Sequence, residues 1–259
     1  MKNTIYLLLF PFLFLFQTDL KAQFAEKIRT GRPGQSIGAY AVGKNVFQLQ
    51  AGGNLSNFYL SDSENISDDK VFAGTAVLRY GLTEKLEVSA VGTYRNNDLF
   101  GAESNEQSGI SNTQIGLRYN ILQNKGIIPA VGLQGRLLLR AQSDDFQRDN
   151  TGAKVILATG NKLTDNLSLT TNLGFTWAGN GGPAKTNYSA ILSVSLGEKW
   201  STFAEIYGSF DVFSTNFDTG LAYFCTPDLK FDISAGLYGR NSLNYLFLDA
   251  GLSWRWHKR

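Results

Sequence analysis

The sequence predicts an all-β protein, a transmembrane up-and-down antiparallel β-barrel of about twelve strands. Three observations lead to this fold class: hydrophobicity that alternates with a period of two, connections that alternate between short and long, and charges that keep to one face of each expected strand. Membrane barrels show this pattern as segments of about ten residues, alternately apolar and polar, separated by turn residues.

The alternation is clearest in residues 167–177. Odd positions there carry Leu, Leu, Thr, Leu, Phe and Trp, and even positions carry Ser, Thr, Asn, Gly and Thr. Similar segments recur along the chain, and most approach the roughly 9–11 residues that a tilted strand needs to cross a bilayer. The expected strands are 46–58, 71–80, 85–95, 112–122, 128–140, 152–160, 166–178, 187–196, 200–212, 216–225, 229–239 and 244–256.

The connections sort into two kinds along the chain. Short ones, such as 81–84, 123–126 and 197–199, alternate with others that are mostly longer and polar, such as 96–111 and 141–151. An up-and-down barrel with a periplasmic and an external rim has this arrangement, because its short turns all fall on one side.

Charged residues inside the expected strands fall on the polar face. A Lys or Arg on the lipid face at mid-depth would cost roughly 2–4 kcal/mol, so this placement favours a membrane barrel over chance. The residues concerned are Arg118, Arg136, Lys154, Glu205, Asp232 and Asp249.

Aromatic residues on the apolar face gather near strand ends. Rings with a polar edge prefer the membrane–water interface, so these residues are expected to form an aromatic belt. They are Tyr80, Tyr94, Tyr119, Trp177, Tyr188, Trp200, Phe210, Tyr223, Trp254 and Trp256.

The N-terminus resembles a secretory signal. Lys2 precedes an apolar run at 5–16, which is too short to span a bilayer as a helix. We therefore expect a signal peptide at 1–22, a periplasmic or lumen-plug segment at 23–45 and the transmembrane barrel at 46–259, located in the outer membrane of a Gram-negative bacterium.

Composition argues against several other functions. The formal net charge is only +2, so no nucleic-acid partner is expected. Cys225 is the only cysteine and His257 the only histidine, which leaves no disulfide framework, no His-dependent triad and no two-His metal site within the barrel. We expect no enzyme, catalytic residue, metal or cofactor.

The polar faces supply candidates for the lumen and the solute path. One hypothesis is that inward-facing rings guide a small amphipathic or aromatic solute. The alternative, slightly favoured, is that the rings pack against segment 23–45 folded into the lumen. The candidates are Arg118, Arg136, Arg140, Phe203, Glu205, Tyr207, Phe224, Tyr238 and Asp249.

Residues 30–36 read Thr-Gly-Arg-Pro-Gly-Gln-Ser, residues 40–52 read Tyr-Ala-Val-Gly-Lys-Asn-Val-Phe-Gln-Leu-Gln-Ala-Gly, and residues 78–87 read Leu-Arg-Tyr-Gly-Leu-Thr-Glu-Lys-Leu-Glu. These stretches resemble the outer-membrane transporters of the MetA-pathway of phenol degradation. Gly31, Gly43 and Gln50 stand where the family pattern has Asp, Pro and Glu. The resemblance implies a barrel in the outer membrane and a transporter of aromatic or other hydrophobic compounds.

The sequence thus predicts a monomeric outer-membrane channel or transporter for small solutes, aromatic or hydrophobic ones among them. The alternative is a closed barrel with a structural or surface-adhesion role that presents loops 96–111 and 141–151. An exported soluble β-sandwich is a further rival. Expected partners are outer-membrane lipid, a small-molecule solute and the barrel-assembly machinery, which would bind the C-terminal strand ending in Trp254-Arg255-Trp256.

Overall fold

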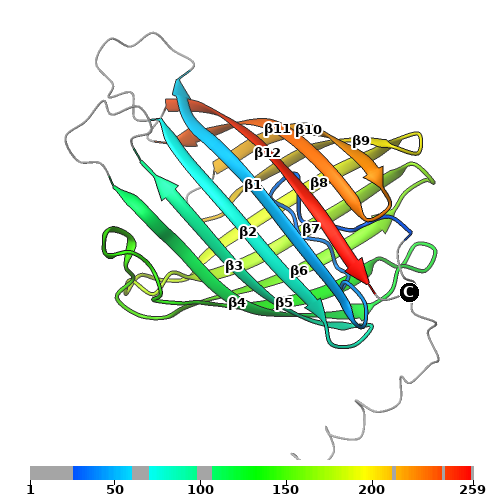
Figure 1. Cartoon of the computed structure of the whole chain (residues 1–259), viewed down its shortest axis with the longest axis horizontal. Helices are drawn as coiled ribbons and strands as arrows, with labels where there is room; N and C mark the ends of the chain where they lie inside the picture. The colour runs from blue at the N-terminus through cyan, green and yellow to red at the C-terminus, as the bar shows by residue number, and fades with distance from the viewer. Residues whose placement is uncertain (1–25, 60–69, 98–106, 212–213, 241–242, 258–259) are drawn as a thin grey trace, which may run out of the picture.

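The computed structural model describes residues 26–59, 70–97, 107–211, 214–240 and 243–257, and twelve antiparallel strands there close into one barrel (Figure 1). Consecutive strands pair with each other, and β1 pairs with β12 to close the ring. The predicted twelve-stranded up-and-down barrel is therefore confirmed. The strands are β1 (Val46–Tyr59), β2 (Val71–Gly81), β3 (Leu86–Asn96), β4 (Ser108–Leu122), β5 (Ala130–Leu138), β6 (Gly152–Lys162), β7 (Leu167–Trp177), β8 (Lys185–Leu196), β9 (Trp200–Ser209), β10 (Ser214–Thr226), β11 (Leu229–Arg240) and β12 (Leu243–His257).

Many strand ends differ from the prediction by one to four residues. β4 begins at Ser108 and not at 112, β5 ends at Leu138 and not at 140, and β9 ends at Ser209 and not at 212. The two-residue period marks the strands but not the points where pairing stops, because the alternation continues past the last paired residues, as at Phe210. As a result, Arg140 and Phe210 lie just beyond the strands that were expected to contain them.

Burial in the barrel is the reverse of that in a water-soluble protein. The large side chains buried most completely are all polar, whereas Leu117 is 53% exposed and Ile115 48% exposed on the outer face of β4. A closed ring of strands with an apolar outside and a polar inside satisfies its backbone hydrogen bonds within a bilayer. The fully buried polar residues are Gln48, Glu87, Asn120, Gln134, Glu205, Asp218 and Ser253.

Two of the short turns share one local structure. The hydroxyl of Thr83 accepts hydrogen bonds from the backbone N–H groups of Lys85 and Leu86, at 3.2 and 3.0 Å. The hydroxyl of Thr164 does the same for Asn166 and Leu167, at 3.3 and 3.1 Å. Both turns follow the pattern Leu-Thr-acid-X-Leu, so a threonine side chain closes each reversal.

The predicted belt residues occupy the two ends of the barrel. Trp200 and Tyr223 lie 4.8 Å apart between ring centroids near the short-turn rim, and Tyr188 and Phe210 lie 4.7 Å apart near the opposite rim. The rings are half-buried or exposed on the outer face, and Trp256 reaches 56% exposure. That these residues form an aromatic belt at the membrane interface stays a prediction.

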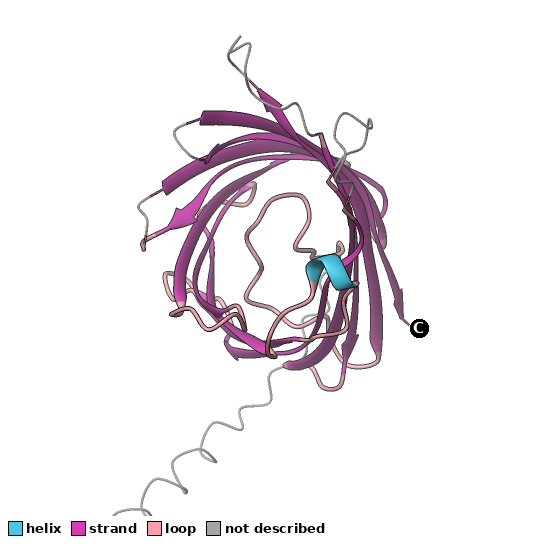
Figure 2. Cartoon of the chain, turned by 90° about the vertical axis from the view of Figure 1, so that its left-hand side faces the viewer, coloured by secondary structure: helices cyan, strands magenta, loops and turns pink. Residues whose placement is uncertain are grey.

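Residues 26–45 run through the interior of the barrel before β1 begins (Figures 1 and 2). Ala39 packs with Ala130 and Ala158 of the wall in a small buried cluster, and Ile37 and Tyr40 lie against it. The expected signal peptide at 1–22 lies outside the described residues. Within the described part of the chain, no helix combines the length and apolarity needed to cross a membrane.

Candidate functional site

The first contact between the N-terminal segment and the wall centres on Arg32. Its guanidinium donates to the carboxylates of Asp232 on β11, at 3.0 Å, and of Asp249 on β12. Asp232 is buried, and both Arg32 and Asp249 are largely buried. Two carboxylates on adjacent strands therefore hold one cation of the segment.

A pair of glycines makes room for Arg32. Gly52 on β1 and Gly251 on β12 face each other directly across the strand pair. A Cβ atom at either position would overlap the Arg32 guanidinium. The segment thus needs glycine here because the arginine lies flat against the backbone of the wall.

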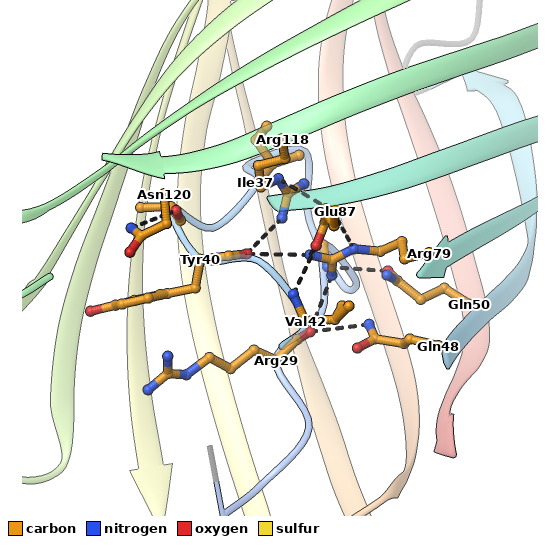
Figure 3. A network of polar contacts seen from close by, with 12 residues as sticks. Arg29, Ile37, Tyr40, Val42, Gln48, Gln50, Arg79, Glu87, Arg118 and Asn120 are labelled. Carbon is orange, nitrogen blue, oxygen red and sulfur yellow. Dashed lines mark hydrogen bonds and ion pairs between the residues drawn. The ribbon is translucent and has the colours of Figure 1, made fainter. Parts of the chain in front are cut away.

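The second contact centres on Glu87 of β3, which is fully buried (Figure 3). Its carboxylate accepts from Arg79 Nε and Nη2 at 2.8 and 2.6 Å and from the backbone N–H of Val42 at 2.9 Å. Arg118 Nε lies 3.6 Å from the same carboxylate. Arg79 and Arg118 also donate to the carbonyl oxygen of Tyr40, at 3.3 and 3.2 Å, so the ion pairs and the segment form one network.

The third contact lies across the barrel, on β7 to β9. Glu205 accepts from the Gln35 N–H at 2.6 Å and from the Ser36 hydroxyl at 2.5 Å. Asn172 accepts from the Ile37 N–H at 2.7 Å and donates to the Ile37 carbonyl oxygen at 2.9 Å. The segment is therefore attached to strands on opposite sides of the lumen.

These contacts have a common electrostatic character. Most use an ionised wall residue, and hydrogen bonds with one ionised partner are roughly twice as strong as neutral ones. Glu87, Asp232 and Asp249 are paired with arginines, whereas Glu205 is held by neutral donors of the segment. The arrangement can hold the segment firmly in place, and loss of either charged partner would weaken it.

A cavity of about 640 Å³ lies between the segment and the wall, on the side of the short turns. Pro33 and Ser36 of the segment line it, as do Ile191, Phe203 and Phe224 of the wall. Its volume falls in the range of about 300–1,000 Å³ that is typical of small-molecule sites.

The four aromatic side chains that were predicted to face the lumen fall into two groups. Phe203 lies beside Gly34, and the Lys27 ammonium lies 5.3 Å from the Phe224 ring centroid, so these two rings contact the segment. Tyr207 and Tyr238 lie farther along the wall, toward the long-loop rim. Tyr238 stacks on Tyr245 at 5.3 Å between centroids.

The predicted charged residues are also distributed between the segment and the rim. Arg118, Glu205 and Asp249 contact the segment. Arg136 faces the lumen beyond it and donates to Gln114 Oε1 at 3.1 Å. Arg140 lies at the rim, where it donates to the carbonyl oxygen of Arg148 at 3.1 Å.

Sequence reasoning missed Arg32, Arg79 and Glu87 as site residues. For the last two a signal was present, because Arg79 and Glu87 flank a short turn on the polar face of one hairpin. For Arg32 the clue was weaker, since only the small polar-face glycines of β1 and β12 indicated that a bulky group could lie there.

Among solved structures, the fold is similar to that of the COG4313 outer membrane channel from Pseudomonas putida F1, with a TM-score of 0.62 and 11% sequence identity over 84% of this chain and 98% of that chain. The KdgM porin in complex with disordered oligogalacturonate gives a TM-score of 0.57, with 10% identity over 81% of this chain and 99% of that chain. The NanC porin gives 0.56, with 12% identity over 80% of this chain and 98% of that chain.

No curated protein matches the chain in sequence. The sequence model of the family described as the MetA-pathway of phenol degradation matches residues 30–256. This match begins in the N-terminal segment that carries Arg32 and extends almost to the end of β12. The chain therefore belongs to that family.

Proposed function

We propose that the chain is an outer-membrane channel for small solutes, aromatic or other hydrophobic compounds among them. The observation that carries this proposal is the closed barrel with an apolar outside and a polar inside that contains a cavity of about 640 Å³. The family membership supports it, as does the likeness to proteins named as an outer membrane channel and as porins.

The location follows from the same features. The apolar outer face would contact lipid, residues 1–22 would direct export, and the short turns would face the periplasm. Trp254 and Trp256 end the last strand, which would be the part recognised by the barrel-assembly machinery. A closed barrel has no open strand edge, which supports a monomer.

The N-terminal segment is proposed to act as a plug. It crosses the lumen and is attached on both sides, at Arg32 and at Gln35 to Ile37. A solute would then pass beside the segment or after its displacement. Twelve strands enclose a lumen between the filled interior of eight and the open channel of sixteen to eighteen, so a segment of this size can narrow it strongly.

The strength of this attachment favours a second candidate, a closed barrel with a structural or adhesive role. In that case the segment would never leave, and loops 96–111 and 141–151 would bind a partner. Residues 98–106 of the first loop lie outside the described part of the chain. Catalysis is not proposed, since His257 lies at the short-turn rim, with Nδ1 3.8 Å from Asp228.

Conductance across a planar bilayer separates these candidates. The protein without residues 1–22 would be refolded in detergent, with a heat-shifted gel band as the folding control. We expect small, steady current steps, and larger ones after deletion of 23–45. A folded barrel that stays silent both with and without the segment would contradict the channel function and favour the structural role.

A further inference from the structure

The lumen wall beyond the N-terminal segment carries a pair of adjacent cations. Arg136 on β5 and Lys154 on β6 are directly opposite each other in the strand register, and both face the lumen. Like charges in this position destabilise a sheet. Among the residues with described positions, no carboxylate forms an ion pair with either side chain.

The cations that contact the segment differ in this respect. Arg79 and Arg118 share the carboxylate of Glu87, and Arg32 lies between two aspartates. The hydrogen bond found for Arg136 is to the neutral amide of Gln114. Glu87, Asp232 and Asp249 thus compensate the cations at the segment, whereas the Arg136–Lys154 pair is left available for an external anion.

A buried amide next to the pair provides a second, independent observation. Gln134 precedes Arg136 by two residues on the same face of β5 and is only 1% exposed. Within the described part of the chain, neither its Oε1 nor its Nε2 has a hydrogen-bond partner, and the same is true of Arg136 Nε. Unpartnered buried polar groups destabilise a protein, so a ligand that accepts from these donors would be favoured.

Arg136 and Lys154 are half-buried and lie between the N-terminal segment and the long-loop rim. The segment contacts β5 and β6 at Gly132, Ala130 and Ala158. Arg136 and Lys154 lie farther toward the rim from which β6 begins. A solute that enters from that side would meet the two cations before it meets the segment.

An apolar surface lies beside the cations. Ile156 of β6 is in register with Gln134 on one side and with Gly174 of β7 on the other. Ile156 is only 7% exposed, and a Cβ atom at Gly174 would lie 3.7 Å from its Cγ1, so the isoleucine packs against the glycine beside the cations.

We infer that Arg136 and Lys154, with the Gln134 amide beside them, form a lumenal binding site for the carboxylate of a small organic acid. A guanidinium can bind a carboxylate with two parallel hydrogen bonds, and the ammonium and the amide add further donors. The inference rests on the proposed channel function, because it names one class of solute for that channel.

Benzoate is the probe, and the uncharged benzamide is its matched partner. Isothermal titration in detergent at low salt would measure binding to the protein without residues 1–22. We expect saturable benzoate binding that weakens about tenfold or more in Arg136→Gln and in Lys154→Gln, with benzamide binding weaker than benzoate and unchanged in these variants. Lys125→Gln, an exposed lysine of the opposite rim, is the control and should bind benzoate like the wild type.

Each outcome is informative. Absence of benzoate binding to the folded wild type, or equal binding by folded Lys154→Gln, would overturn the inference. Lys154→Gln serves as the second variant if Arg136→Gln fails to give the heat-shifted band. Binding with a silent bilayer would keep the site and contradict the channel, whereas conductance without benzoate binding would keep the channel and contradict the site.

Discussion

Arg32→Gln tests the attachment of the N-terminal segment most directly. The substitution keeps a polar side chain of similar length but removes the positive charge between Asp232 and Asp249. Both carboxylates, two register positions apart on β11 and β12, then lose the cation between them. We expect the equilibrium to shift from the docked segment toward the released one.

The magnitude follows from burial. Removal of one partner from a buried ion pair typically costs about 3–5 kcal/mol. Arg32 is 16% exposed and Asp249 20%, so water can reach the site and the lower end, about 3 kcal/mol, applies. Each 1.4 kcal/mol is a factor of ten, so release should become roughly 100-fold more favourable.

Thiol labelling measures this equilibrium. Ser36→Cys in a Cys225→Ser background places a single thiol where the side chain is 6% exposed and docked against Glu205. A charged, water-soluble thiol reagent should then label this position only when the segment leaves the wall. The rate should rise roughly 100-fold with Arg32→Gln, and it should fall again when Asp232→Asn and Asp249→Asn are added.

A small change would refute the reasoning. If labelling accelerates less than about threefold while the heat-shifted band is intact, Arg32 does not hold the segment, because such a ratio corresponds to under about 1 kcal/mol. Failure of the two Asn substitutions to reverse the effect would show that it does not arise from uncompensated carboxylates.

Two further predictions concern the wall. Gly251→Val places a side chain where the Arg32 guanidinium lies and changes no charge, so labelling of the thiol at position 36 should accelerate as it does in Arg32→Gln. A labelling rate equal to that of the parent would show that the glycine is not needed for docking. Leu117→Arg places a charge on the outer face of β4 and should lower the free energy of unfolding in urea by roughly 2–4 kcal/mol, as measured by loss of the heat-shifted band, and an unchanged midpoint would contradict a lipid-facing position.

The strands could be predicted because the two faces of this barrel differ so strongly. Leu117 and Arg118 are adjacent in sequence, yet one is among the exposed apolar residues and the other is buried. Lipid on one side and a polar lumen on the other impose a period of two on the whole chain. The alternation does not mark where backbone pairing stops, which explains the misplaced ends of β4, β5 and β9.

The site was less predictable because it depends on contacts between distant residues. Arg32 is separated from Asp232 by 200 positions, and only the register of the closed barrel brings them together. Sequence reasoning placed Glu205 and Asp249 on the lumen face but could not assign their partners. Arg79 and Glu87 are only eight positions apart, so their pairing depends on one hairpin and was within reach.

The two glycines that accommodate Arg32 have a consequence for the order in which the barrel and the N-terminal segment fold. Gly52 belongs to the first strand and Gly251 to the last, and they become neighbours only when β1 pairs with β12. Arg32 precedes both glycines in the chain and is synthesised first, yet the position that it occupies between them does not form until the final strand is in place. Docking of Arg32 therefore comes after closure of the barrel, whereas the contact of Val42 with Glu87 involves β3 and does not need the closing strand pair.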